Sequence, residues 1–215
     1  MTKVYPKALP LPKPSDGCIK AGADDSSSRV LTVWRKSLLF NCDGFTVFDA
    51  DGNLVYRVDN YMSGNKGEIF LMDASGTSLL TIRRKKLSLT DSWLVFDGET
   101  ADNPRFVATK NVVNLLKSKS KRLLAHVTSP RKNTAVYEIE GSYSQRCCAV
   151  YDEKRRRVAE IKQKEASVKG VAFGTDIFRL VVQPGFDATV AMAIVILLDQ
   201  MFGSSTSTRR RLLTN

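Results

Sequence analysis

A single histidine, four cysteines and an aspartate-containing turn are the residues of this 215-residue sequence whose types could support catalysis or bind a metal. A Cys–His or Ser–His nucleophile pair would have to use His126, and neither a GxSxG elbow nor a cysteine signature accompanies it. The sequence also has no Walker loop and no GxGxxG motif for a phosphate-bearing cofactor. We therefore expect no catalytic residue, no cofactor and no enzymatic activity.

The stretch FDADGN resembles half of a calcium-binding loop, and its spacing tests that interpretation. An EF-hand loop needs glycine at its sixth position and an acidic residue at its twelfth. Counted from Asp49, glycine falls at the fourth position, as Gly52, and the twelfth residue is Asn60. The stretch therefore predicts a hairpin turn rather than a metal site.

The cysteines, Cys18, Cys42, Cys147 and Cys148, show no metal-ligand spacing. We expect buried free thiols of a reducing compartment, with the adjacent pair on opposite faces of a strand. The N-terminal MTKVYPKALPLPKP contains four prolines and lacks the apolar segment of a secretory signal. These features predict an intracellular protein.

Basic residues are the strongest functional signal, because the formal net charge is +11. Such an excess favours anionic partners, namely nucleic acid, acidic lipid headgroups or acidic proteins. The KSKSKR run alternates, which in a strand would align its lysines on one side and let them meet phosphates. No RNP-type run or helix-turn-helix pattern supports sequence-specific reading of nucleic acid. The candidate anion-binding residues form three clusters: Arg83, Arg84, Lys85, Lys86; Lys117, Lys119, Lys121, Arg122; and Lys154, Arg155, Arg156, Arg157. A further basic run, Arg209 to Arg211, lies in the tail.

The chain divides by composition into a Pro/Ser-rich leader (1–28), one domain (29–203) and a basic tail (204–215) expected to be disordered. The domain consists of short apolar or alternating runs separated by turn residues, which predicts about a dozen antiparallel strands. These runs are RVLTVW, SLLF, FTVF, LVYRV, EIFLM, SLLTI, WLVF, RFVAT, RLLAHV, AVYEI, RCCAVY, VAEIK and IFRLVV.

A repeated turn pattern supports a sheet of hairpins. Asp49, Asp73 and Asp97 are each 24 residues apart. Counted from the aspartate as position one, glycine takes the fourth position in the first two units, as Gly52 and Gly76. The frame recurs from Asp152, where Arg155 replaces the glycine. Aspartate can accept backbone N–H groups in a turn, and glycine adopts a positive φ, so each frame predicts a β-hairpin.

The stretch FDATVAMAIVILLDQMFG near the C-terminus predicts a helix that is buried on all sides. Its apolar run, Ala188 to Leu198, covers only about 16 Å as a helix, whereas a membrane span needs about 20 residues. Apolar residues also occupy every angle around the helix, so a surface location is excluded. Because the rest of the chain predicts only strands, the enclosing wall must be sheet. We therefore predict a mainly β fold, a closed antiparallel barrel of about twelve strands around this helix.

Several long blocks of the sequence resemble the plant LURP-one-related family. They include LTVWRKSLLFNCDGFTVFDADGNLVYRVDNY (31–61), IRRKKLSL (82–89), WLVFDGE (93–99) and VAMAIVILLDQMFG (190–203). The family is similar in fold to the tubby C-terminal domain and the phospholipid scramblases, so the resemblance implies a twelve-stranded barrel around a hydrophobic helix. It also implies a role in plant defence and an association with phosphoinositides or bilayers.

Three functions follow as hypotheses. The first is a non-enzymatic regulatory protein that docks on an anionic phospholipid surface through basic clusters, at the plasma membrane. The second is an intracellular protein-interaction or transcription-associated factor that uses its basic surface for nuclear import or nucleic acid. The third, lipid scrambling, would place the apolar helix in the bilayer, and the length of the helix argues against it. The partners expected are thus anionic membrane or unidentified proteins.

Overall fold

A computed structural model of the chain describes residues 27–36, 44–61, 67–86, 90–99, 102–111, 123–130, 134–164 and 174–203. These residues form twelve strands and one helix. The strands are β1 (Arg29–Trp34), β2 (Gly44–Phe48), β3 (Leu54–Tyr61), β4 (Glu68–Asp73), β5 (Ser78–Arg84), β6 (Ser92–Asp97), β7 (Phe106–Lys110), β8 (Leu123–Thr128), β9 (Ala135–Ser142), β10 (Cys147–Asp152), β11 (Arg157–Gln163) and β12 (Ile177–Val182), and the helix is α1 (Ala188–Phe202). Of the predicted strand runs, SLLF (37–40) lies outside the described residues.

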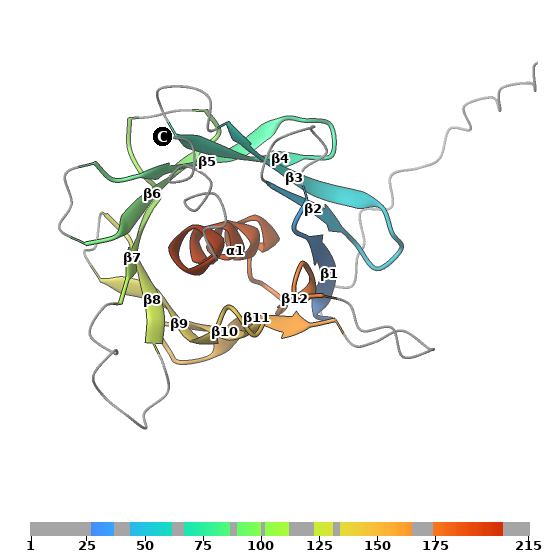
Figure 1. Ribbon diagram of the computed structural model, residues 1–215. Helices are drawn as coiled ribbons and strands as arrows, with labels where there is room; N and C mark the ends of the chain where they lie inside the picture. Colours follow the sequence, from blue (N-terminus) through green and yellow to red (C-terminus); the bar gives the residue numbers. More distant parts are fainter. Residues whose placement is uncertain are drawn as a thin grey trace, which may run out of the picture.

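The strands form a closed antiparallel barrel in which each strand pairs with its neighbours in sequence and β1 pairs with β12. Figure 1 looks into the ring and shows α1 at its centre. The predicted fold class is confirmed. Because the strands alternate in direction, the β2–β3, β4–β5, β6–β7, β8–β9 and β10–β11 connections and the start of α1 share one end, called here the β2–β3 end. The other connections and the C-terminus of α1 share the β5–β6 end.

The barrel wall has an apolar inner face because side chains alternate along each strand. On β1, Leu31 and Val33 are fully buried whereas Val30 and Trp34 are exposed. The inward residues of the other strands are also mostly aliphatic and, like Leu80, Ile82 and Leu180, belong with the helix to one buried cluster. The alternation of apolar and polar residues along each strand therefore determines which side chains of the sheet face the helix.

Helix α1 is buried over almost its whole length, from Val190 to Leu198 and again at Met201. Its 15 residues extend about 22 Å along the barrel interior. No helix in the described part of the chain is long and apolar enough to cross a membrane. The prediction of an enclosed core helix is confirmed.

Polar contacts hold both ends of α1. At the start, Asp187 is the N-cap residue, and its Oδ1 accepts a hydrogen bond from the backbone N of Thr189 at 2.8 Å. At the end, the Lys110 Nζ donates to the Met201 carbonyl at 2.7 Å, and the Asp199 Oδ1 lies 3.2 Å from the Arg35 Nε. The last turn of the helix contains no basic residue, so the wall supplies the cations that its carbonyl end favours.

Three hairpins share the predicted turn. In each, an aspartate Oδ1 accepts the backbone N–H four residues later, at 2.8 to 2.9 Å, in the pairs Asp49–Asn53, Asp73–Thr77 and Asp152–Arg156. The residue three positions after the aspartate has a positive φ, 86° at Gly52, 92° at Gly76 and 61° at Arg155. A register shift accompanies each turn, as expected for a hairpin closed by a bulge. The frame from Asp152 was thus predicted correctly despite its missing glycine.

The Asp97 region does not share this turn, although its spacing fits. Asp97 ends β6 and is followed at once by Gly98, whose φ is 59°. The connection to β7 is longer, and Arg105 returns to pair with the Asp97 carboxylate at 3.2 Å. The 24-residue spacing from Asp73 to Asp97 therefore reflects the regular spacing of strands rather than a further copy of the turn.

One expectation about the cysteines was wrong. Cys147 and Cys148 are free thiols on opposite faces of β10, as predicted, but only Cys148 is buried and Cys147 is exposed. The reason is the alternation of the strand, which turns one of two adjacent residues outward. Cys18 and Cys42 lie outside the described residues.

The enclosed helix predicts a large cost for removing a side chain from its centre. Ile196 has no exposed surface, and truncation in a sealed core leaves a cavity, so Ile196→Ala should lower the free energy of unfolding by about 2–5 kcal/mol. Urea denaturation followed by circular dichroism measures this. Val30→Ala, on the outer face, is the matched control and should cost less than about 1 kcal/mol. Equal costs at the two positions would contradict an enclosed helix.

The turn at Arg155 predicts an unusual preference for glycine. Arg155→Gly and Arg155→Ala both remove the guanidinium group, but only alanine keeps a Cβ at a positive φ. The glycine variant should therefore unfold at a higher urea concentration than the alanine variant. At Arg156, where φ is not positive, alanine should equal or exceed glycine. If the glycine variant were more stable than the alanine variant at both positions, the positive φ of Arg155 would not explain the preference.

Candidate anion-binding ends of the barrel

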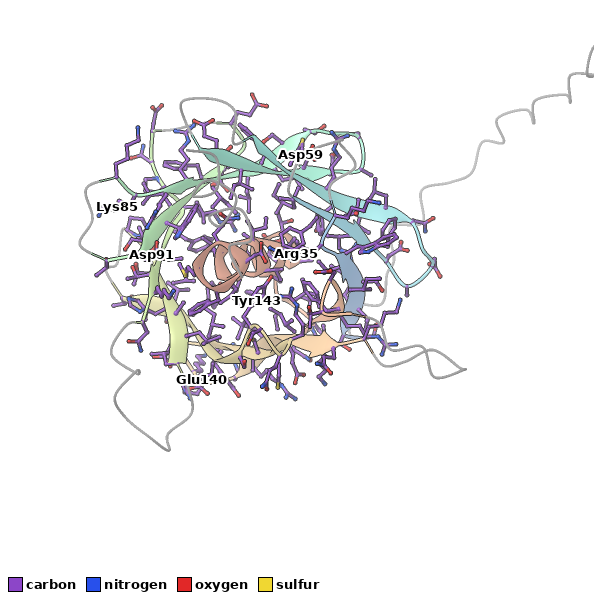
Figure 2. All side chains as sticks on the ribbon, in the orientation of Figure 1. Arg35, Asp59, Lys85, Asp91, Glu140 and Tyr143 are labelled. Carbon is purple, nitrogen blue, oxygen red and sulfur yellow. The ribbon has the colours of Figure 1, made fainter. Side chains whose placement is uncertain are left out.

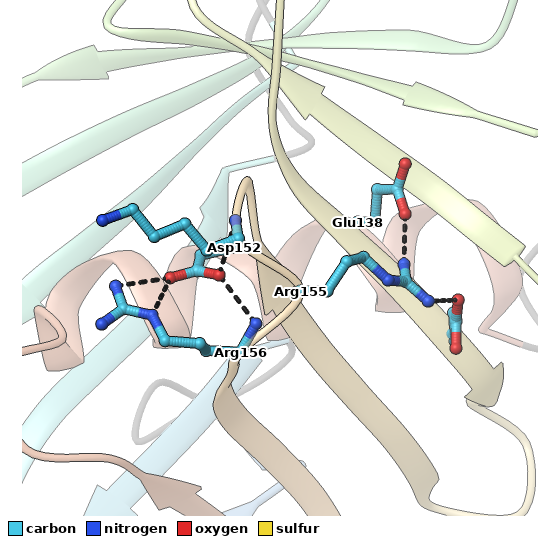
Figure 3. Close-up of polar contacts among 6 residues, drawn as sticks. Glu138, Asp152, Arg155 and Arg156 are labelled. Carbon is cyan, nitrogen blue, oxygen red and sulfur yellow. Dashed lines mark hydrogen bonds and ion pairs between the residues drawn. The ribbon is translucent and has the colours of Figure 1, made fainter.

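The cluster Lys154, Arg155, Arg156 and Arg157 forms the β10–β11 hairpin, and carboxylates surround it. Figure 3 shows the Arg155 guanidinium between two acidic residues of β9, with Nη1 donating to Glu138 and Nη2 donating to Glu140 at 2.8 Å. The Arg156 Nε donates to the Asp152 Oδ2 at 2.8 Å. These partners satisfy the two guanidinium groups internally.

The other two members of this cluster also lie close to acid. The Arg157 Nη1 is 3.4 Å from the Glu160 carboxylate. Lys154 is exposed and follows Glu153 directly, and its backbone N donates to the Asp152 Oδ1 at 3.0 Å. An incoming anion would have to displace or approach these carboxylates. The hairpin is therefore a poorer anion site than its sequence indicates.

The cluster Arg83, Arg84, Lys85 and Lys86 lies at the other end of the barrel, where β5 ends. The Arg83 Nε is 3.1 Å from Glu68, and its guanidinium carbon lies 5.2 Å from the centre of the Phe96 ring. Arg84 is mostly exposed, with its Nη2 3.2 Å from the Asp91 carboxylate. Lys85 and Lys86 are exposed and have no ion-pair partner among the described residues. Figure 2 shows Lys85 at the periphery of the ring, away from the helix.

Lys117, Lys119, Lys121 and Arg122 lie outside the described residues, as does the basic run Arg209 to Arg211. The order of the chain shows only which described elements these two groups follow. The first group belongs to the connection between β7 and β8, and the second follows the C-terminus of α1. Both of these attachment points lie at the β5–β6 end.

Charge is unequally divided between the two ends of the described barrel. At the β2–β3 end, acidic side chains outnumber basic ones: Asp49, Asp51, Asp73, Asp97, Glu99, Asp102, Asp152, Glu153 and Asp187 against Arg29, Arg105, Lys154, Arg155, Arg156 and Arg157. At the β5–β6 end the balance is reversed: basic side chains, Arg35, Lys36, Arg83, Arg84, Lys85, Lys86, Lys110, Arg146, Lys162 and Lys164, outnumber the acidic ones, Asp59, Glu68, Asp91, Glu160, Asp176 and Asp199. The described clusters therefore do not form one patch, and the β5–β6 end is the more basic surface.

Not all cations of the β5–β6 end are available to a ligand. Arg35 and Lys110 hold the helix, and Arg146 is buried, stacked between the Tyr143 and Phe178 rings at 4.1 and 4.4 Å. Figure 2 places Arg35 and Tyr143 over the centre of the ring. The Tyr143 hydroxyl donates to the Asp199 Oδ1 at 3.1 Å, and burial together with the Asp199 charge raises the pKa of Tyr143 well above its ordinary value. These residues close the end of the barrel.

Lys36 is a basic residue of this end that the sequence clusters missed. It is exposed, it follows β1, and no carboxylate of the described chain pairs with it. Counting strands would have found it, because the residue after the first strand and the residues after the fifth strand must share an end of an up-and-down barrel. Lys162 is also exposed, but it pairs with Glu160 at 3.0 Å. Lys36, Lys85 and Lys86 are thus the exposed lysines of this end that have no ion-pair partner among the described residues and could meet an anion.

The β2–β3 end contains two hollows of about 290 and 370 Å³ that share Tyr137 and Asp152. The Tyr137 ring, which lines both hollows, lies 5.3 Å from the Phe186 ring and 6.2 Å from the Phe106 ring. The arginines at their margins are the ones already bound to carboxylates. These contacts connect the start of α1 to the wall.

The described residues offer little for covalent catalysis. His126 lies on β8 with its side chain half buried, across from Glu138 on β9 and Thr109 on β7. Burial, with a smaller contribution from Cys147, raises the pKa of the Cys148 thiol to about 12, so the thiolate needed for attack is scarce at neutral pH. In the part of the chain that the structure describes, no group of three His, Cys, Asp or Glu side chains could hold a metal ion.

Comparison with known proteins gives a consistent set of relatives. Protein LURP-one-related 8 from Arabidopsis thaliana is 55% identical over 207 residues, which cover 95% of this chain and 100% of the relative. Protein LURP-one-related 17 from the same plant is 46% identical over 206 residues, covering 89% and 92% of the two chains. An X-ray structure of another Arabidopsis thaliana protein is similar with a TM-score of 0.59 and 25% identity, covering 81% of this chain and 92% of that one.

The family assignment agrees with the fold. A sequence profile described as LURP-one-related matches residues 29–199, which run from the first residue of β1 almost to the end of α1. The matched span therefore contains all twelve strands and most of the helix. On this match and on these identities, the chain belongs to the LURP-one-related family.

Proposed function

We propose that this protein is a non-enzymatic regulatory module that docks on an anionic phospholipid surface through the β5–β6 end of its barrel. The observation that carries the proposal is the pair Lys85 and Lys86, exposed and without an ion-pair partner in the described chain, at the end where basic residues outnumber acidic ones. Lys36 adds an exposed cation at the same end. Each lysine near an anionic membrane contributes about 1 kcal/mol of attraction.

Phosphoinositide headgroups are the ligands that fit this arrangement best, because each carries several phosphate charges and can meet more than one lysine. Docking would take place at the cytoplasmic face of the plasma membrane. A role in plant defence is the physiological setting that belongs to this proposal, and it rests on the family resemblance alone.

Lipid is favoured over nucleic acid for a structural reason. A helix that reads DNA must enter the major groove, but α1, the single helix among the described residues, is enclosed by the barrel. The basic surface of the β5–β6 end can therefore supply only phosphate contacts, which carry no sequence information. A membrane surface requires no more than such contacts.

Co-sedimentation of the full chain with vesicles tests the proposal. We expect binding to phosphatidylcholine vesicles that contain phosphatidylserine or a phosphoinositide, weaker binding as salt rises, and none to pure phosphatidylcholine. The double variant Lys85→Ser, Lys86→Ser should lose roughly thirtyfold in affinity, because two contributions of about 1 kcal/mol are removed.

The matched control removes the same charge from the other end of the barrel. Lys154→Ser, Arg157→Ser should bind nearly as well as the unchanged protein, since those residues lie among carboxylates. Equal losses in the two double variants would mean that only net charge matters and would refute the assignment to the β5–β6 end. Indifference to acidic lipid at low salt, or tighter binding to DNA at physiological salt, would overturn the proposed function.

A further inference from the structure

An exposed tryptophan stands at the basic end of the barrel. Among the described residues, the large hydrophobic side chains that are exposed are Val30 and Trp34, and Trp34 is the more exposed at 43%. Both belong to β1, where the inward positions are Leu31 and Val33. Trp34 therefore points away from the core, and its ring contributes little to holding the barrel together.

The position of Trp34 along β1 distinguishes it from Val30. Trp34 is the last residue of the strand and pairs across the sheet with Ile177, the first residue of β12. Both lie at the β5–β6 end, whereas Val30 pairs with Val181 near the β2–β3 end. Between these two apolar pairs lies the polar pair Thr32 and Arg179. Only the Trp34–Ile177 pair is thus placed beside the basic surface.

The neighbours of Trp34 fix its orientation. Arg35, the next residue, donates its backbone N to the Asp176 carbonyl at 2.8 Å and turns its side chain inward to Asp199. Because successive side chains of a strand point to opposite faces, an inward Arg35 requires an outward Trp34. Lys36, the residue after, is exposed. An aromatic ring and a lysine thus project at the edge of the same surface.

Tryptophan combines a large apolar body with one N–H donor, and it favours the boundary between lipid headgroups and acyl chains. A purely electrostatic contact with a membrane gains nothing from such a side chain, but a contact that reaches this boundary buries it. We propose that Trp34 enters the headgroup–acyl boundary of an anionic bilayer when the β5–β6 end docks. This inference rests on the proposed function. It adds to that function an orientation of the barrel on the membrane and an apolar contribution to the binding free energy.

The two tryptophans of the sequence allow a direct test. Trp93 lies on β6 and is only 7% exposed, so it serves as an internal reference. With anionic vesicles that contain brominated phosphatidylcholine, the fluorescence of the full chain should shift to shorter wavelength and be quenched. The Trp34→Phe variant, which leaves Trp93 alone, should show neither change. The shift and the quenching are measured on the unchanged protein, and the variant assigns them to Trp34.

Binding of variants gives a second readout. Trp34→Ser should weaken binding to phosphatidylserine vesicles by roughly tenfold, from the loss of buried apolar area. Val30→Ser, on the same strand but at the other end of the barrel, should leave binding unchanged. Circular dichroism confirms that each variant is folded.

The outcomes separate this inference from the proposed function. If anionic vesicles bind but Trp34 is not quenched and Trp34→Ser binds normally, the inference is wrong while electrostatic docking stands. If no vesicle binds, the proposed function itself fails. Quenching of Trp34 by single-stranded nucleic acid in preference to lipid would indicate base stacking and would overturn the lipid assignment.

Discussion

The fold depends on the need to cover an apolar helix on every side. A helix with an apolar face can lie against one layer of sheet, but α1 is buried around its whole circumference, so the sheet must close. An eight-stranded barrel is filled by its own side chains. Twelve strands leave room for the helix, and the helix in turn supplies the core that so wide a barrel would otherwise lack. Closure also removes the exposed strand edges that would favour aggregation.

Filling the barrel with its own helix limits the sites at which it can act. The inner face of the wall and the helix form one continuous apolar cluster, so the described barrel has no room for a ligand on its axis. Function must then lie on the outer wall or at the ends. The polar groups that close the β5–β6 end, with Asp199 receiving both Arg35 and Tyr143, stabilise the helix terminus and leave the outer lysines free for other contacts.

Local signals in the sequence were enough to predict the twelve described strands, the helix and the turns that begin at Asp49, Asp73 and Asp152, but the 24-residue spacing was misleading at Asp97. The Asp152 frame predicted a hairpin although arginine replaces the glycine, and in the structure Arg155 has the positive φ that glycine has in the other two turns. What the sequence did not reveal was the neutralisation of Arg155, because its partners Glu138 and Glu140 come from β9 and meet it only through the register of β9 with β10. The alternation of β1 implies that one set of its residues is exposed. Predicting that Trp34 belongs to that set requires knowing which residues of the strand face the helix.

The distribution of charge matters more than its total. A net charge of +11 attracts the protein to any anionic surface, but evenly spread charge would not orient it. Here the basic run after β5 and the basic run after β10 fall at opposite ends simply because one follows an odd-numbered strand and the other an even-numbered one. The aspartates required by the hairpin turns then gather at the β2–β3 end and offset the cations there. The turns that build the barrel thus also make it electrostatically polar, and this polarity is the reason that the proposed docking uses the β5–β6 end.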